Sequence, residues 1–453
     1  METSELAGLS APVQASVHLL IPFYIHKSLK FRLNLVQSSE WKHAHMETGF
    51  YLRYVDAIFF TEKDKASQNP LVSKCLVMEN SCCESKLTVR KQEITLEKAR
   101  LFCFDTSVGL LDFHLAFSCP SIEEVTNVCA RLRQTDMPCK ISEKDPVTSN
   151  FLQQQKTTVS CLASKLLSSL GDYTLFDHVG PSGIHRAELL ASVIMDASAS
   201  ADLDSMMYRV AEGIDMRSED CISAVSPYCP LPHIRWAITR KGACNVGLLT
   251  ENKVNREYVE TRLHNSISNR HMIWYVLVLH QKYAIYHYLN DIARIKSPSD
   301  LKSFQKKVMS FNTEYRFEVI ADDSAFQLPY EKTREVKSVE PIFSDIDEEI
   351  QRIHAYYDSI RDKNTGVAMT IVSLVCAIST FVDIFSLSLL EEPIYEAICH
   401  LSTPQIILYG ITICAMAVAL GYLVVKPMCK KIFGWIRSLA YCLMKFFLKR
   451  QGK

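Results

Sequence analysis

Two long apolar stretches near the C-terminus constrain this chain more than any other feature. Residues 367–390 contain one charged side chain, Asp383, and residues 406–425 contain none. About 20 apolar residues are needed to cross the hydrocarbon core of a bilayer as a helix, and both stretches reach that length. The pattern predicts two transmembrane helices within residues 366–425, joined by a short loop at 391–405. The alternative is a pair of buried helices in a soluble core.

The flanking charges predict how such a pair would be oriented. Basic residues precede the first stretch at Arg361 and Lys363 and follow the second from Lys426, whereas no Lys or Arg lies in between. The connecting loop is acidic, with Glu391, Glu392 and Glu396. Lys and Arg are enriched on the cytoplasmic side of membrane proteins. We therefore expect both termini in the cytoplasm and the acidic loop outside.

The tail at 426–453 carries eight basic side chains and no acidic one. Its apolar residues recur at helical spacing, at Ile432, Ile436, Leu439, Leu443 and Phe446. Such a basic amphipathic segment is typical of a helix that lies in the anionic cytoplasmic surface of a membrane. A shorter re-entrant segment is the alternative.

A polar stripe runs along the first apolar stretch. At 100° per residue, one helical face carries Ser373, Cys376, Thr380, Asp383 and Leu387. A carboxylate inside a bilayer is costly, so it usually faces water or a partner. These five residues are the pore-lining candidates, with a ring of Asp383 side chains if subunits assemble around an axis. Alternatively, Asp383 reaches water at the outer interface and has no specific role.

Composition restricts the chemistry of the remaining chain. Lys plus Arg and Asp plus Glu both number 50, so overall charge indicates no nucleic-acid partner. The 16 cysteines contain no CxxC pair, which favours a reduced cytosolic compartment without a disulfide framework or a metal site. The N-terminus lacks the basic start and apolar run of a signal peptide.

The first 265 residues are expected to form a mixed α+β (α/β) domain in the cytosol. β-Branched and aromatic residues predict strands, and apolar periodicity predicts helices. The expected strands are 17–26, 49–61, 87–95, 98–104 and 109–118, and the expected helices are 122–133 and 157–170.

Residues 266–365 are expected to form a stalk of long helices leading to the membrane. Helices are predicted at 274–292 and 300–319, and a third runs without a helix breaker from Pro341 to Gly366. His280 and His287 share a face of the first of these helices, but their spacing favours core histidines over metal ligands.

No nucleotide-binding, hydrolase or metalloprotease motif occurs, so no catalytic residue is assigned and an enzyme is not expected. Two basic clusters could touch a phosphate: Arg186 after a small-residue turn, and Arg235, Arg240 and Lys241 around Gly242. Solvated surface charges are the alternative for both.

Residues 270–430 combine a long helix, two apolar spans, an acidic loop and a basic tail. This arrangement resembles the CorA cation-channel superfamily, and the strings Leu101–Leu111 and Leu279–Ala284 are similar to those of divergent bacterial CorA-like proteins. The resemblance implies a multi-pass protein of the bacterial inner membrane, assembled from identical subunits, most often five. CorA channels place Gly-Met-Asn after the first span, whereas this chain has Asp383–Leu390. Selective Mg²⁺ transport is therefore in doubt.

Divergent CorA-like proteins also serve as membrane effectors of type III CRISPR antiviral systems, in which a nucleotide messenger binds the cytosolic domain. The resemblance thus implies a ligand-gated pore with a nucleotide ligand. Two alternatives stay open: a transporter of Mg²⁺ or another divalent cation with an altered filter, and a non-conducting scaffold tethered to membrane lipid.

Overall fold

The computed structural model describes residues 12–389, with gaps at 45, 48, 60–72, 81–84, 145–150, 177–185, 198–202 and 215–225. Of residues 226–229, 377, 378 and 380–389 it describes the backbone alone. The chain divides into two compact units, residues 1–352 and residues 353–453.

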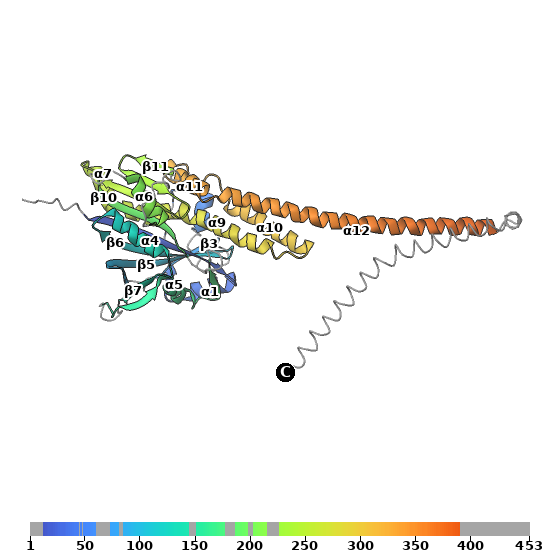
Figure 1. Ribbon diagram of the computed structural model, residues 1–453, viewed down its shortest axis with the longest axis horizontal. Coiled ribbons are helices and arrows are strands. Elements are labelled where there is room, and N and C mark those ends of the chain that lie inside the picture. Colours follow the sequence, from blue (N-terminus) through green and yellow to red (C-terminus); the bar gives the residue numbers. More distant parts are fainter. Residues whose placement is uncertain are drawn as a thin grey trace, which may run out of the picture. The chain divides into compact units, whose positions relative to one another are not determined.

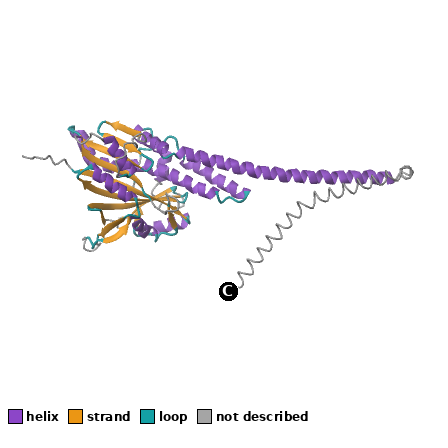
Figure 2. Cartoon of the chain, in the orientation of Figure 1, coloured by secondary structure: helices purple, strands orange, loops and turns teal. Residues whose placement is uncertain are grey.

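Thirteen strands in the described part of the first unit form one sheet, drawn in orange in Figure 2. The strand order is β11-β12-β13-β10-β1-β6-β5-β4-β7-β8, while β3 pairs with β2 and β5, and β9 pairs with β1. Neighbouring strands are antiparallel except for β10 and β13, which are parallel. The strands are β1 Val13–Ile25, β2 Trp41–His43, β3 Cys75–Asn80, β4 Ser85–Val89, β5 Gln92–Phe104, β6 Val108–Cys119, β7 Pro138–Glu143, β8 Gln155–Thr158, β9 Tyr173–Leu175, β10 Glu188–Asp196, β11 Ser226–Leu231, β12 Ile234–Ile238 and β13 Gly242–Leu249.

Helices pack on this sheet (Figure 1). Side-chain caps mark several of their starts, as at Ser121 before α4 and at Ser297 before α10, where Pro298 opens the helix. The helices are α1 Ser28–Gln37, α2 Arg53–Phe59, α4 Ile122–Arg133, α5 Val159–Leu167, α6 Leu203–Glu212, α7 Lys253–Thr261, α8 Leu263–Ser266, the π-helix η4 Ile267–His271, α9 Met272–Ile292, α10 Pro298–Tyr315, α11 Ser324–Val336 and α12 Val339–Leu389.

Strand β1 shows why the two faces of the sheet differ. Successive side chains of a strand point to opposite faces. One set is apolar and packs in the main core with residues of α1, α4, α5 and α6; it comprises Val13, Ala15, Val17, Leu19 and Ile21. The other set includes His18, which bonds Ser268 of η4, and Tyr24, which bonds a carbonyl of α9. Polar groups are thus buried on the second face.

Helix α9 belongs to the first unit and is docked on the sheet. Its residues from Met272 to Gln281 are all buried, and the Tyr275 hydroxyl donates to the carbonyl of Leu189 in β10 at 2.8 Å. This compact unit extends as far as Arg352. His280 lies fully buried in α9, as expected of a core histidine.

The mixed α and β character is confirmed, and several predicted elements are found. Two strand predictions were wrong. Residues 49–61 contain α2 instead of a strand, because Val55, Ile58 and Phe59 are buried at helical spacing despite their β-forming composition. Residues 87–95 are split between β4 and β5 by a turn at Arg90, whose φ is 58°.

Helix α12 is continuous over 51 residues, which agrees with the absence of a helix breaker after Pro341. In the described part of the chain, no helix is both long and apolar enough to cross a membrane. The second apolar stretch at 406–425, the loop at 391–405 and the tail at 426–453 lie outside the described residues.

Candidate functional site

A basic pocket of about 330 Å³ lies where α4 ends, near the start of β10 and the turn between β12 and β13. Four of its lining residues are cationic, namely Arg131, Arg133, Arg186 and Lys241. The other lining residues are Ala130, Gln134, Met137, Gly213 and Ile214. We refer to this cavity as the basic pocket.

Backbone bonds between α4 and β10 bring the arginines together. The amide of Ala187 donates to the carbonyl of Arg133 at 3.0 Å, and Gln134 forms a β-bridge with Arg186. Arg131 and Arg133 lie in the last turn of α4, where the negative end of the helix dipole favours cations.

Two glycines make room for the pocket. Gly213 ends α6 with a φ of 63°, and an added Cβ would lie 2.9 Å from Cδ of Arg133. Gly242 follows Lys241, and its added Cβ would lie 2.5 Å from the carbonyl oxygen of Ala211. Both positions therefore favour glycine, and at Gly213 the missing Cβ leaves room for the side chain of Arg133.

The pocket holds more positive charge than its carboxylates neutralise. Lys241 pairs with Glu212 at 2.7 Å, but Arg133 and Arg186 form no ion pair within the described residues, and the Nε of each is buried without a hydrogen-bond partner. Arg133 is only 7% exposed, and its burial lowers the pKa of the guanidinium, as does nearby Arg186, against the opposing effect of Glu188. Among the described residues, the pocket thus gathers four cationic side chains of which Arg133 and Arg186 have no ion pair, and this lining suits an anion.

The structure brings together two of the four predicted ligand-binding residues, Arg186 and Lys241. It places Arg235 elsewhere, in an ion pair with Asp204 at 3.5 Å, and Arg240 does not line the pocket. Arg131 and Arg133 were missed. The available signal was the basic pair in the last turn of the predicted helix 122–133, but its distance in sequence from Arg186 gave no indication that the two meet.

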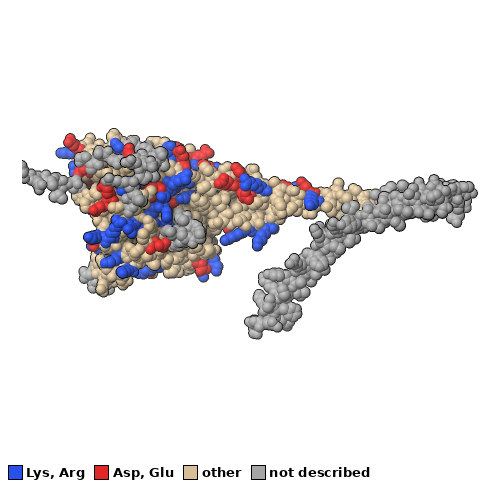
Figure 3. Space-filling model, in the orientation of Figure 1, with Lys and Arg blue, Asp and Glu red and all other residues tan. Residues whose placement is uncertain are grey.

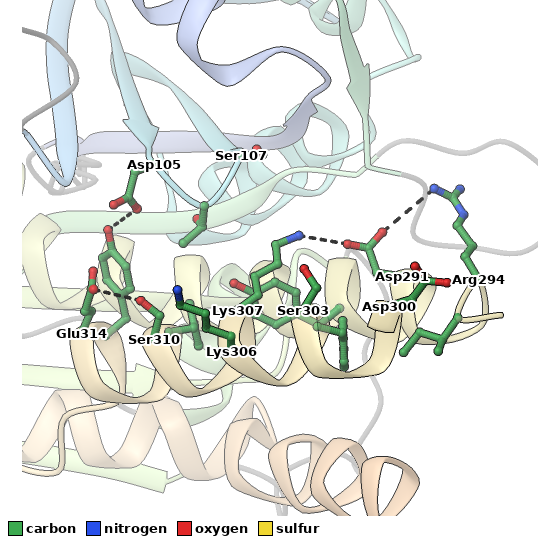
Figure 4. A pocket seen from close by; sticks show the side chains of 16 residues that line it. Asp105, Ser107, Asp291, Arg294, Asp300, Ser303, Lys306, Lys307, Ser310 and Glu314 are labelled. Carbon is green, nitrogen blue, oxygen red and sulfur yellow. Dashed lines mark hydrogen bonds and ion pairs between the residues drawn. The ribbon is translucent and has the colours of Figure 1, made fainter. Parts of the chain in front are cut away.

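A larger cleft of about 670 Å³ lies between the turn after β5, the end of α9 and α10 (Figure 4). Most of its charged groups already have partners. Lys307 lies 3.0 Å and Arg294 4.0 Å from carboxylate oxygens of Asp291, and Tyr315 donates to Asp105. Because its charges are largely matched internally, the cleft is less suited to capture an anion than the basic pocket.

A buried network on the second face of the sheet has the residue types of a hydrolytic triad. Nδ1 of His18 lies 3.0 Å from Asp112, and its Nε2 lies 2.8 Å from the hydroxyl of Ser268. All three residues are at most 3% exposed, and none lines the basic pocket or the cleft. The arrangement therefore suits a structural network that satisfies buried polar groups.

The pore-lining candidates share one face of α12, because the helix continues without a break through all five. Ser373 and Cys376 are exposed, whereas the side chains of Thr380, Asp383 and Leu387 lie outside the described residues. So do Glu391, Glu392 and Glu396 of the predicted outer loop. Among the side chains that are described, no group of three or more His, Cys, Asp or Glu residues could hold a metal ion.

Comparison of the chain with protein-family models, with curated proteins and with solved structures finds no match. The resemblance to CorA-like proteins therefore stays a prediction from the sequence.

Proposed function

We propose that this protein is a homo-oligomeric membrane pore whose conduction is controlled by an anionic ligand of its N-terminal unit. One observation carries the proposal: in the single chain, several large apolar side chains of α12 between residues 367 and 375 are exposed. Val367, Met369, Val372 and Val375 are 41%, 65%, 57% and 59% exposed. In Figure 3 the described part of this helix turns uniformly tan beyond its last red and blue side chains.

Such exposure is unfavourable in water, at roughly 25 cal/mol per Å² of apolar surface. Lipid or neighbouring subunits would remove this cost. The length and composition of residues 367–390 fit a bilayer span, and the uncharged stretch at 406–425 supplies a second one. With the basic flanks, this supports two transmembrane helices with both termini in the cytoplasm of a bacterial inner membrane.

The basic pocket supports an anionic ligand for the N-terminal unit. A guanidinium group can donate two parallel hydrogen bonds to phosphate oxygens. Among the described residues, no carboxylate lies at ion-pair distance from Arg133 or Arg186. A nucleotide messenger, as implied by the likeness to type III CRISPR effectors, carries such phosphates.

Ion flux through the purified protein in liposomes tests this function. We expect flux that depends on a nucleotide messenger and that changes when Asp383→Asn is introduced. The control is Leu374→Ala, which lies about 180° around the helix from Asp383 and should leave flux unchanged. Steady flux that falls as internal Mg²⁺ rises would indicate a divalent-cation transporter instead, and the absence of flux under all conditions would indicate a non-conducting scaffold.

A further inference from the structure

A buried lysine stands at the start of α12. Lys337 lies between α11 and α12, and its side chain has no exposed surface. Its Nζ donates to Oε2 of Glu188 in β10 at 2.8 Å and to the carbonyl oxygen of Arg240 at 3.1 Å. The ammonium group also lies 5.4 Å from the ring centre of Tyr275. The beginning of the long helix is thus fixed to the sheet by one charged side chain.

Both acceptors of Lys337 are chain neighbours of the basic pocket. Glu188 follows the pocket residue Arg186 by two positions, and Arg240 immediately precedes the pocket residue Lys241. A small shift of Arg186 or Lys241 is therefore expected to move the Glu188 carboxylate or the Arg240 carbonyl, the two groups that accept hydrogen bonds from Lys337.

Charge also connects the two places. Glu188 receives Lys282 at 2.6 Å as well as Lys337, so it is surrounded by cations. Burial lowers the pKa of Lys337 to about 8, Glu188 counteracts this, and Lys282 and Arg133 lower the pKa further. Arg133 of the basic pocket thus acts on Lys337 through its charge.

The connection ahead of α12 contains a residue in a left-handed backbone conformation. Ser338, directly after Lys337, has a φ of 55°, a left-handed conformation that is uncommon for a residue other than glycine. Non-glycine residues in such conformations persist only when surrounding contacts hold them, and they occur at switch regions. Contacts hold the chain on both sides of Ser338: Lys337 bonds Glu188 before it, and Glu340 pairs with Arg316 and Arg334 after it.

We propose that a phosphate-type anion bound between Arg133 and Arg186 controls the start of α12 through the buried Glu188–Lys337 ion pair. This inference rests on the proposed function for its consequence at the membrane. The bound anion neutralises Arg133, so the ammonium of Lys337 is held more firmly against Glu188 and the first turns of α12 become more rigid.

Titration of the full-length protein in detergent with inorganic sulfate and phosphate tests the site. Calorimetry should show saturable binding, and Arg186→Gln should weaken it at least about tenfold, because a charge-assisted pair of bonds is lost. Arg133→Lys serves as a second variant that retains the charge but loses the planar guanidinium, and it should weaken binding less. Arg235→Gln, outside the pocket, is the matched control and should bind like the unmodified protein.

Hydrogen exchange of the same samples tests the coupling. Saturating phosphate should slow amide exchange at residues 337–346 by about fivefold, a typical size for coupling between sites. Lys337→Met should abolish this slowing. Sulfate affinity should fall roughly threefold from pH 7 to pH 9, because Lys337 loses its proton in this range. The charged and titratable groups around Lys337 are Glu188, Lys282, Tyr275 and Arg133. Lys337→Met should remove the pH dependence of sulfate binding.

The outcomes separate the two proposals. If neither anion binds, or if Arg186→Gln binds as well as the unmodified protein, the anion site is wrong. If phosphate binds in the pocket but exchange at 337–346 does not change, the coupling through Lys337 is wrong. Anion binding and hydrogen exchange are both measured without ion flux. A protein that binds the anion and shows the slowed exchange but conducts no ions would therefore contradict the proposed pore function and leave the anion site intact.

Discussion

At the scale of single residues, His280 shows how the core of the first unit depends on a neutral imidazole. The ring stacks on Phe104 with centroids 3.7 Å apart, and its Nε2 lies 2.7 Å from the hydroxyl of Thr106. Burial lowers the pKa of His280 well below its usual value of 6.5. The unfolded chain therefore takes up a proton below pH 6.5 that the folded chain does not bind, so stability falls as the pH falls through that value.

We expect the free energy of unfolding to fall between pH 7 and pH 5, and His280 to contribute to this fall because burial lowers its pKa. His280→Phe, which keeps an aromatic ring in the stack, should reduce the loss of melting temperature over the same interval. His43→Gln, at an exposed position of β2, is the control and should retain the full loss. An unchanged pH dependence in His280→Phe would exclude this residue as a source of acid sensitivity.

The His18–Asp112–Ser268 network allows a second prediction at this scale. Asp112→Ala leaves Nδ1 of His18 buried without its partner, and the loss of one member of a buried pair costs about 3 kcal/mol. Thermal unfolding should show a correspondingly lower melting temperature. Glu93→Ala, which breaks an exposed pair with Lys86, should change the free energy by less than about 1 kcal/mol. Equal effects of the two substitutions would argue against a stabilising network.

At the scale of elements, the sequence predicted best where pattern and capping agree. Helix α4 begins and ends at the predicted residues, because Ser121 caps an amphipathic run. The prediction of a strand at 49–61 was wrong because the Tyr, Val, Ile and Phe residues there favour strands by composition. The buried residues at 55, 58 and 59 instead follow a helical period. The hairpin between β4 and β5 was missed because its turn at Arg90 and Lys91 contains no glycine, proline or asparagine.

The parallel pairing of β10 with β13 yields a prediction about two glycines. An added Cβ at Gly242 would meet backbone oxygens of Ala211 and Leu189 at 2.5 and 2.8 Å. At Gly247 it would meet the side-chain ends of Leu263 and Val259, which can move. Gly242→Ala should therefore destabilise the protein by about 3 kcal/mol and Gly247→Ala by about 1–2 kcal/mol. Melting temperatures of the two variants in parallel measure the difference, and the reverse order would contradict the strand packing.

At the scale of the whole molecule, the basic pocket could be predicted only in part. Its cationic residues come from the end of α4, the segment before β10 and the turn before β13, so they are far apart in the sequence. Strand order brings them together, and no local pattern encodes that β10 lies between β1 and β13. Arg186 and Lys241 could be predicted as candidate ligand-binding residues because each lies next to a glycine-containing turn. The sequence around Lys337 and Glu188 contains no motif that predicts their ion pair.

The environment of α12 decides whether the molecule acts at a membrane, and a charge scan along this helix tests it. Val372→Asp places a carboxylate where the side chain is 57% exposed in the single chain. In water such a substitution is nearly neutral, whereas inside a bilayer a charged residue at the helix centre costs about 3 kcal/mol.

We therefore expect Val372→Asp to reduce the fraction of protein recovered with membranes after expression, relative to the soluble fraction. Ala355→Asp, at another exposed position in the charged segment of α12, is the control and should partition like the unmodified protein. Both variants should retain the anion binding of the first unit, which shows that they are folded. If Val372→Asp stays in the membrane fraction and is fully retained there, position 372 contacts neither lipid nor an apolar subunit interface but faces water.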